Sequence, residues 1–491
     1  MSGLLFCLLL VPLVGAFVCY WLRGRVSDLV PACLAGLTFI LGMASIVLGY
    51  PQSQEFLFGG HWINWIGTTP ETSFGFLIDP LSSLMLIVIT VIGLLVVIYS
   101  IEYFSSRNKD HAFKKPVSNY YFWMLLFIGS MVGLVISPSF LQLFIFWEMT
   151  TICSWALISY NKDDTALFNG FKAFIMTHLG GLCFLIALAV LFVNAHSFSF
   201  SALDKLGPEM RFTVFMLFLV AAWAKAAQIP FFTWLPDAMV APTPVSAYLH
   251  AAAMVKAGVY LIARVAVSNT MLSDGAGLVL GIMAVATMVV AVIMYFIQDD
   301  LKRLLAFSTI GHLGYILFGI SLGILGSDTG FKGGILHIIN HGCAKGLLFL
   351  CVGAIAYATG SKSIKELSGL GRKMLLVSTA FIVGFLAVTG VPPLSCFWSK
   401  FMIFTGAFEL GGIAGPVLGT IAILESVAAF AWYLFVGHKV FFGPVSEKAS
   451  VATADPPMAI NVTLIVIMIL SLLAPLIGYA FVQYLSVGCF S

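Results

Sequence analysis

The fold of this chain is decided by residues 225–264, KAAQIPFFTWLPDAMVAPTPVSAYLHAAAMVKAGVYLIAR. The preceding residues 212–223 are apolar except for Thr213, so Lys225 enters at membrane depth, and Pro230 follows five residues later. Because a proline lacks a backbone donor and clashes with the carbonyl four residues back, we expect the helix to break near residues 228–233. A broken helix is tolerated in a bilayer only where it is buried in protein or lines a wet cavity.

A second apolar helix is expected from about residue 244 to 265, and it carries His250 and Lys256. These two residues are six positions apart, roughly a turn and two-thirds, so they do not share one helix face squarely. The segment is therefore predicted to be a hydrophobic hairpin with a helix break and three titratable groups inside it.

The composition agrees with a membrane setting. The chain has 491 residues, of which 60% are hydrophobic and 9% are charged, whereas about a quarter of the residues in a soluble domain are charged. The net charge of +3 is too small to suggest a nucleic-acid partner. The nine cysteines lack Cys-x-x-Cys spacing and mostly lie in apolar runs, so we interpret them as small buried residues rather than metal ligands or a disulfide framework.

The apolar runs predict fourteen membrane spans, each long enough for ~30 Å of hydrocarbon. Their expected limits are about 3–22, 29–50, 78–103, 119–137, 139–159, 169–193, 211–233, 243–266, 273–298, 303–324, 332–358, 375–406 (interrupted), 413–440 and 459–485. The loops between them are too short to be separate soluble domains. The chain is therefore predicted to be an all-α polytopic membrane protein in a lipid bilayer.

The placement of basic residues predicts the orientation. Odd-numbered loops hold fifteen lysines and arginines, including Arg23, Arg25, Lys114 and Lys115, and even-numbered loops hold four. By the positive-inside rule, the odd loops face the cytoplasm and both termini face outward.

The remaining basic residues lie within or near the predicted spans: Lys172, Lys225, Lys256, Lys345 and Lys400. An ionised group at the bilayer centre costs at least ~2.5 kcal/mol. The acid Glu148, also at membrane depth, is the expected counter-ion. Because burial lowers and a carboxylate raises the pKa of a lysine, a lysine with a movable partner can switch protonation state. The bland alternative is a static pair or a side chain that reaches the interface, and it is strongest for Lys172.

The histidines extend this relay. His337, His341 and Lys345 follow one another at intervals of four, which puts them on one helix face. Two histidines at this spacing could bind zinc, but no acid or cysteine completes a ligand set and the lysine would repel a cation. A proton relay is therefore favoured over a metal site. His178, His250 and His312 stand singly, and each could be merely hydrogen-bonded.

A second helix interruption is expected at residues 389–400, TGVPPLSCFWSK, where Pro392 precedes Lys400. The offset from Pro230 to Pro392 is 162 residues, or five spans, and an odd number of spans inverts the second copy in the membrane. Broken helices at matching positions of inverted halves indicate an ion path. We expect water at both breaks and a polar axis joining them along the membrane midplane.

The chain resembles the antiporter-like subunits of respiratory complex I, of Mrp-type cation/proton antiporters and of membrane-bound energy-converting hydrogenases. The residues that carry the resemblance are FWE (146–148), Lys225 with Pro230, WLPDAM (234–239), APTPVSAYLH (241–250), MVKAGVY (254–260), DLKRLLAFST (300–309), His341 to Lys345 and GVPPLS (390–395). The resemblance covers about residues 75–440. It implies a Glu148–Lys225 pair and a hydrated axis through Lys225, His250 or Lys256, Lys345 and Lys400.

The resemblance also implies how the chain is divided. Helices 1–3 would occupy residues 1–118, two inverted five-helix repeats would occupy 119–268 and 269–441, and helix 14 would occupy 442–491. The sequence departs from the family pattern at His312, where glutamine is usual, and at Cys396, where glycine is usual. Glu425 is an additional acid inside a span, and its role is not predicted.

Two functions compete. The first is a proton- or sodium-translocating subunit of a larger redox-driven or antiport complex in the cell membrane, and the second is a stand-alone cation/proton transporter. A scaffold subunit with residual charges is a third, weaker interpretation. The sequence has no dinucleotide fingerprint, no cysteine cluster and no haem motif, so we expect no cofactor on this chain. Any redox chemistry would belong to hydrophilic partner subunits, and further antiporter-like subunits would be membrane partners.

Overall fold

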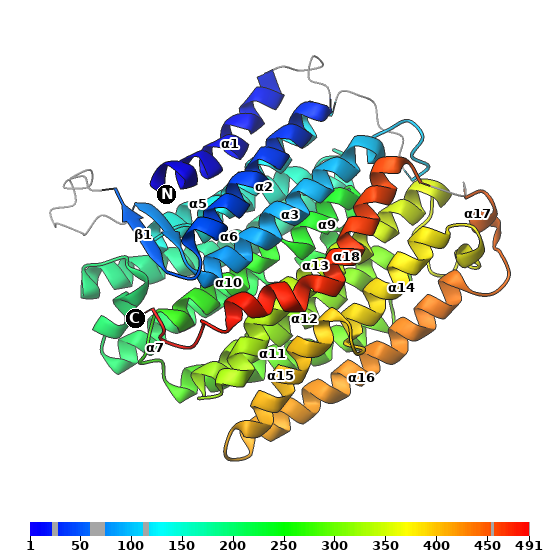
Figure 1. The fold of residues 1–491 in the computed structure, drawn as a ribbon. Coiled ribbons are helices and arrows are strands. Elements are labelled where there is room, and N and C mark those ends of the chain that lie inside the picture. Colours follow the sequence, from blue (N-terminus) through cyan, green and yellow to red (C-terminus); the bar gives the residue numbers. More distant parts are fainter. Residues whose placement is uncertain (22–27, 59–73, 111–116, 453–455, 491) are drawn as a thin grey trace.

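The computed structural model describes residues 1–21, 28–58, 74–110, 117–452 and 456–490. Long helices lie side by side in one bundle, and the two marked chain ends lie at the same end of it, near strand β1 (Figure 1). The first half of the chain holds α1 Ser2–Trp21, α2 Leu29–Gly49, α3 Pro80–Tyr103, α4 Ser118–Val135, α5 Phe140–Ile158, α6 Asp164–Ala195, η2 Phe200–Lys205, α7 Pro208–Lys225, α8 Trp234–Asp237, η3 Ala238–Val240, α9 Thr243–Ala251 and α10 Met254–Val267.

The second half continues the bundle with further long helices. They are α11 Asp274–Tyr295, α12 Leu301–Ile324, α13 Asp328–Thr359, α14 Leu375–Thr389, α15 Ser395–Glu409, α16 Ala414–Phe441 and α18 Met458–Val482, with the short η4 Leu370–Arg372 and α17 Glu447–Ser450 between them. Several helices begin where the sequence supplies a capping side chain. Asp79 accepts a hydrogen bond from Ser82 N at the start of α3, and Asp300 accepts one from Arg303 N at the start of α12.

Twelve helical segments of the described chain are long and apolar enough to cross a membrane. The other two predicted spans, 211–233 and 375–406, are each divided into shorter pieces. Helix α7 ends at Lys225, and a gap of non-helical residues separates α14 from α15. The predicted interruption of the second of these spans is therefore confirmed.

Two features differ from the predicted all-helical pattern. Strand β1 Gln54–Leu57 pairs antiparallel with β2 Gly75–Ile78, which makes a small hairpin between α2 and α3. The span expected to be one helix over residues 243–266 is broken after Ala251 and restarts at Met254. The sequence hides this break because it falls in a run of alanines, which have the highest helix propensity. At this break α13 packs closely, since a Cβ on Gly342 would lie 3.0 Å from Ala251 O.

The bundle has a fully enclosed centre and a more open periphery. The most apolar windows of α12, α13 and the α9–α10 segment are completely buried, whereas that of α16 is 28% buried. The exposed residues of the peripheral helices are largely apolar, as expected of surfaces that face lipid or other membrane subunits. The enclosed helices carry two lysines and four histidines that the sequence places at membrane depth, namely Lys256, Lys345, His250, His312, His337 and His341.

Candidate functional site

The first helix break positions Lys225. In a continuous helix Pro230 would clash with the carbonyl of the residue four positions back, Ala226, and α7 ends immediately before that residue. The carbonyls that the break frees are partly satisfied by side chains. Gln228 Nε2 donates to Ala226 O at 2.8 Å, and Trp234 Nε1 donates to Ala224 O at 3.0 Å. The break therefore begins slightly earlier than residues 228–233, and Lys225 is its last helical residue.

The second helix break is constructed like the first. Ala227 and Gly390 both have positive φ, +48° and +88°. The same two backbone hydrogen bonds follow in each break: Gln228 N to Trp223 O and Phe231 N to Gln228 O in the first, Val391 N to Leu386 O and Leu394 N to Val391 O in the second. Equivalent residues are 163 positions apart, as from Gln228 to Val391. This register differs by one from the predicted 162, so Pro230 matches Pro393, and Pro392 is its neighbour within the same break.

The Lys225 ammonium lies against α5. Its Nζ donates to Trp147 O at 2.7 Å, to Thr150 Oγ1 at 2.5 Å and to Thr151 Oγ1 at 2.9 Å. These acceptors use all three donors of a lysine. The Nζ also lies 4.8 Å from the centre of the Trp147 ring, within range of a cation–π interaction. Lys225 is fully buried, and it is held by neutral oxygens of the helix that carries Glu148.

Glu148 is bonded to a histidine rather than to Lys225 in this structure. Its Oε2 lies 2.9 Å from His178 Nδ1 of α6, and its Oε1 is buried without a hydrogen-bond partner among the described residues. The side chains of His178 and Glu148 are 41% and 22% exposed, so this pair reaches the outer face of α5 and α6. The expected Glu148–Lys225 pair is thus open, with both members on or against α5.

Lys256, in the first turn of α10, contacts α13. Its Nζ donates to Ile338 O at 3.0 Å and lies 2.9 Å from His341 Nδ1. A lysine ammonium only donates, so a charged Lys256 requires that His341 Nδ1 accept and that His341 carry its proton on Nε2. That Nε2 is buried without a hydrogen-bond partner among the described residues. His341 can therefore pass a proton onward only after its ring turns or water reaches Nε2.

The histidines of α12 and α13 form one stack. The rings of His312 and His337 are 5.2 Å apart at their centres, as are those of His312 and His341. His312 Nδ1 lies 2.9 Å from His337 Nε2, and His337 Nδ1 lies 2.8 Å from Ser399 Oγ. Ser399 Oγ also donates to Cys396 O at 3.2 Å, so its lone pairs face His337. The network thus favours a proton on His337 Nδ1, which leaves His337 Nε2 to accept from His312.

The last two lysines lie beyond this stack. Lys400 Nζ donates to Ser426 Oγ at 2.9 Å and to Thr389 O, a carbonyl at the second break, at 3.3 Å. Lys345 Nζ donates to Leu305 O and Tyr433 Oη, both at 3.3 Å. Both lysines are buried.

The remaining predicted histidine has different surroundings. The His250 ring packs on Phe349 at a centre distance of 4.6 Å, and both of its nitrogens are buried without hydrogen-bond partners in the described chain. His250 therefore lies in the core without a direct bond to the other relay candidates. Lys172, for which a static pair was an open alternative, donates to Asp237 at 2.7 Å.

The sequence did not predict several residues of the site, because their role depends on tertiary contacts. Thr150, Thr151 and Ser399 are ordinary polar residues of apolar helices until a lysine or histidine packs against them. One signal was available for the two threonines, since both lie within a single helical turn of Glu148.

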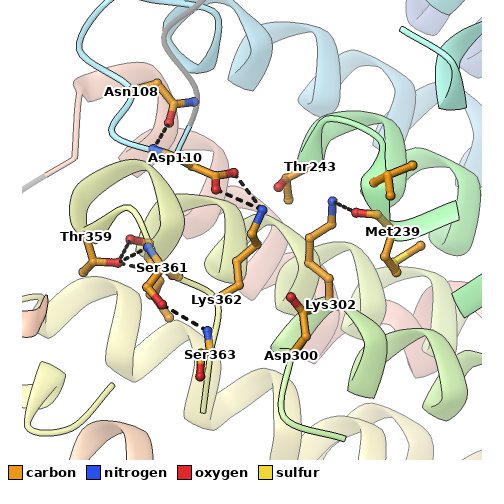
Figure 2. A network of polar contacts seen from close by, with 12 residues as sticks. Asn108, Asp110, Met239, Thr243, Asp300, Lys302, Thr359, Ser361, Lys362 and Ser363 are labelled. Carbon is orange, nitrogen blue, oxygen red and sulfur yellow. Dashed lines mark hydrogen bonds and ion pairs between the residues drawn. The ribbon is translucent and has the colours of Figure 1, made fainter. Parts of the chain in front are cut away.

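A polar cavity of about 140 Å³ opens near the helix end where α3 and α13 terminate, and its lining includes Tyr103, Asp110 and Lys362. Figure 2 shows Lys362 directed at Asp110, and the distances are 2.9 and 3.0 Å to the two carboxylate oxygens. Burial lowers the pKa of Lys362, but the negative charge of Asp110 outweighs burial and holds the pKa above its usual value. In the same network, Lys302 donates to Met239 O at 2.8 Å, which fixes the segment between the first break and α9 (Figure 2).

A second polar cavity, of about 310 Å³, is lined by Glu55 of the hairpin and by Asp79 and Arg264, among others. Asp79 accepts hydrogen bonds from both terminal nitrogens of Arg264, and Tyr260 Oη lies 2.8 Å from Arg264 Nη2. Lys256, Tyr260 and Arg264 are spaced by four on α10, so one face of this helix leads from the histidine stack toward the cavity.

Comparison with known proteins identifies the family. A family model described as NADH:quinone oxidoreductase/Mrp antiporter, TM, matches residues 137–425, more than half of the chain. The chain belongs to this family of antiporter-like transmembrane subunits. A second model, described as NADH-ubiquinone oxidoreductase (complex I), chain 5 N-terminus, matches residues 62–114. The resemblance inferred from the sequence is therefore confirmed, and the chain is a multi-pass membrane protein.

Individual relatives agree with this family. The chain is 36% identical over 379 residues to a Na(+)/H(+) antiporter subunit of Staphylococcus epidermidis, covering 72% of this chain and 46% of that protein. It is 33% identical over 432 residues to a Na(+)/H(+) antiporter subunit of Alkalihalophilus pseudofirmus, covering 83% and 53%. The chain therefore spans about half the length of these curated relatives.

Two solved structures share the fold. The Mrp complex from Dietzia sp. superposes with a TM-score of 0.84 at 29% identity, covering 98% of this chain and 52% of that chain. A membrane-bound sulfane sulfur reductase, an archaeal respiratory membrane complex, superposes with a TM-score of 0.83 at 25% identity, covering 98% and 96%. This chain therefore matches nearly the whole length of the chain in the second structure, but only about half of the chain in the first.

Proposed function

We propose that this antiporter-like subunit moves protons or sodium ions across the membrane through its buried lysine and histidine residues. The observation that carries the proposal is an unbroken series of side-chain contacts in the enclosed centre of the bundle. Lys256 is hydrogen-bonded to His341, His341 stacks on His312 without a hydrogen bond between the two rings, and His312 is hydrogen-bonded through His337 to Ser399, whose neighbour in sequence is Lys400. Buried ionisable groups in a membrane protein are expensive to keep, and they typically mark ion paths.

The chemistry of this series suits proton transfer. Each imidazole both donates and accepts a hydrogen bond when neutral, so a proton added at one nitrogen can leave from the other. Each lysine can hold the extra charge near the membrane centre while neutral oxygens stabilise it, as they do around Lys225. Glu148, bonded to His178 at the outer face, would give the series a negatively charged terminus near the first break.

The domain organisation belongs to the same proposal. Residues 119–268 and 269–441 would be two inverted five-helix repeats, flanked by residues 1–118 and 442–491, with fourteen spans in total. The equivalent hydrogen bonds at the two breaks support this division. Helices α6 and α13 support it as well, because each has 32 residues and occupies the third position of its repeat.

We further infer that the odd-numbered loops face the cytoplasm of a cell membrane and that both termini face outward. The common position of the two chain ends in Figure 1 supports an even number of crossings. The bias of fifteen basic residues to four supplies the direction. Four of the fifteen, Arg23, Arg25, Lys114 and Lys115, lie outside the described residues.

The protein would act within a larger assembly. The structural relatives are named as the Mrp complex and as a respiratory membrane complex. We expect other membrane subunits as partners and place any redox cofactor on hydrophilic subunits. The test is to tag the chain, extract it from its own membranes in mild detergent, and measure ion flux after reconstitution of the assembly and of the chain alone. Ion flux by the reconstituted assembly, with none by the isolated chain, supports the proposal. Full flux by the isolated chain would instead identify a stand-alone transporter, and flux by neither preparation would contradict ion transport.

A further inference from the structure

Glu425 is a buried acid of α16 that the path above does not use. It is 5% exposed, although its neighbours Leu424 and Val427 are 64% and 61% exposed. It therefore lies on the inward-facing side of α16, in line with Ala422 and Ala429, which are 0% and 5% exposed. An ionisable side chain at this depth is costly unless nearby groups compensate its charge, so its surroundings are informative.

Glu425 lies beside Lys400, with Tyr315 of α12 between them. Glu425 Oε2 accepts a hydrogen bond from Tyr315 Oη at 2.5 Å. The Lys400 ammonium lies 4.6 Å from the centre of the same tyrosine ring and donates to Ser426 Oγ, the residue next to Glu425. The phenol thus contacts the acid through its hydroxyl and the lysine through its ring face.

The same construction surrounds Lys225 in the first half of the chain. Lys225 lies 4.8 Å from the centre of an aromatic ring, that of Trp147, the neighbour of Glu148. It donates to two hydroxyl groups on the helix of that acid, and Lys400 donates to one hydroxyl group on the helix of Glu425. In both halves the lysine therefore rests on a ring and on hydroxyls beside a carboxylate, without a direct ion pair to that carboxylate in this structure.

The register of the two breaks explains why this acid comes from a different helix. A shift of 163 residues carries Glu148 to Gly311 of α12, which has no side chain. A Cβ placed on Gly311 would lie 3.5 Å from Glu425 Oε1. The carboxylate of Glu425 thus lies beside the position that corresponds to Glu148, but it reaches that position from α16.

We propose that Glu425 is the acid partner of Lys400, so that the second half of the chain has its own acid–lysine switch, similar in its contacts to that of Glu148 and Lys225 although its residues come from other positions in the repeat. This inference rests on the proposed path and adds a residue to it. In the step that joins the two groups, the Lys400 ammonium loses a proton and the Glu425 carboxylate gains one, so a charged pair becomes a neutral amine and a neutral acid. The Tyr315 hydroxyl donates a hydrogen bond to the Glu425 carboxylate, the group that receives the proton.

A thermal-unfolding cycle on the purified full-length assembly tests the pair without relying on transport. The variants are Glu425→Gln, Lys400→Met and the double variant, and the comparison cycle combines Glu425→Gln with Lys225→Met. We expect the double variant to be less destabilised than the sum of the two single variants, because each single variant leaves the other charge buried without compensation. We expect the comparison cycle to be additive. Additivity in the first cycle would overturn the proposal, as would coupling of equal size in both cycles.

Ion flux provides the functional arm. We expect Glu425→Gln to reduce flux about 100-fold, the lower end for loss of a positioned proton-transfer group, and Glu425→Asp to retain much of it. Glu409→Gln, at the exposed end of α15, is the matched control and should leave flux unchanged. Wild-type flux in Glu425→Gln would overturn the proposal. If Glu425→Gln fails to assemble, recovery of assembly on adding Lys400→Met supports the pair, and failure of the double variant contradicts it. The unfolding cycle remains decisive if the path as a whole proves not to conduct.

Discussion

The hydroxyl groups around Lys225 allow the switch in the first half of the chain to be tested by a small change. Thr151→Val keeps the shape of the side chain and removes one of the three oxygens that accept from Lys225 Nζ, at 2.9 Å. Thr151 also bonds Trp147 O, the carbonyl four residues before it, so the helix loses a local hydrogen bond as well. The matched control is Thr90→Val on α3, where a buried threonine makes the same kind of bond to Leu86 O without a lysine.

The expected effect follows from the strength of the lost bond. A hydrogen bond from a charged group contributes about 1.5–3 kcal/mol, and a loss of about 2 kcal/mol corresponds to a factor of about 30. Removing the bond destabilises the position in which Lys225 is held by neutral oxygens and favours approach to Glu148. If transport requires Lys225 to alternate between the two positions, a bias of this size slows the cycle by up to about 30-fold.

The assay is ion flux in vesicles that contain the assembled complex, with the amount of this protein quantified in each preparation. The ion flux of Thr151→Val should be slow, whereas that of Thr90→Val should match the flux of the unaltered protein. In a Glu148→Gln background, Thr151→Val should have a much smaller additional effect, because Lys225 then has no carboxylate to approach. If the two threonine variants carry equal flux, the holding position of Lys225 has no part in transport and the reasoning fails.

Three further predictions concern other groups of the site. His312→Leu and His312→Gln should both reduce flux strongly, because His312 links His341 to His337 and a glutamine amide can donate to His337 Nε2 but cannot take up and release a proton as an imidazole does; unaltered flux in His312→Gln would remove this imidazole from the path. The pKa of Lys362 is raised in the folded state, so its pair with Asp110 should stabilise the fold fully below pH 10.5, and this stabilisation should be lost as the pH rises further. Asp110→Asn should remove this loss of thermal stability at high pH. If the loss persists in Asp110→Asn, another group is responsible for it. Asp79→Asn leaves Arg264 buried without its charge partner and should destabilise the chain by about 3–5 kcal/mol, measured by unfolding against the exposed-pair control Glu102→Gln; equal stability of the two variants would show that the buried pair is not needed.

Much of the fold follows from the sequence because apolar length and proline chemistry act locally. Pro230 predicts a break, and the helix ends where its clash with Ala226 requires. The break after Ala251 could not be predicted, since alanines favour a helix and the close approach of Gly342 to Ala251 O is a tertiary contact. The sequence thus locates the spans better than the irregularities within them.

The titratable residues were predictable as a set, whereas their partners were not. Lysines and histidines in apolar spans are conspicuous in a sequence, and four of them lie in one series of contacts that leads to Lys400. The partner of Glu148 in this structure is His178, thirty residues away on another helix. Glu425 had no predictable role because its significance depends on an empty position at Gly311, which is visible only once α12 and α16 are packed together.

The proposed path depends on Lys256, which joins the first half of the chain to the histidine stack. The most direct test is ion flux by the assembled complex carrying Lys256→Met, which preserves much of the side-chain volume and removes the ammonium. Lys365→Met is the control, because the Lys365 side chain is 76% exposed outside the path. We predict that flux falls at least about 100-fold in Lys256→Met, as expected when a proton-transfer group is lost, while Lys365→Met is unaffected. Equal flux from the two variants, at equal assembly, would contradict the central claim that ions cross through this series of residues.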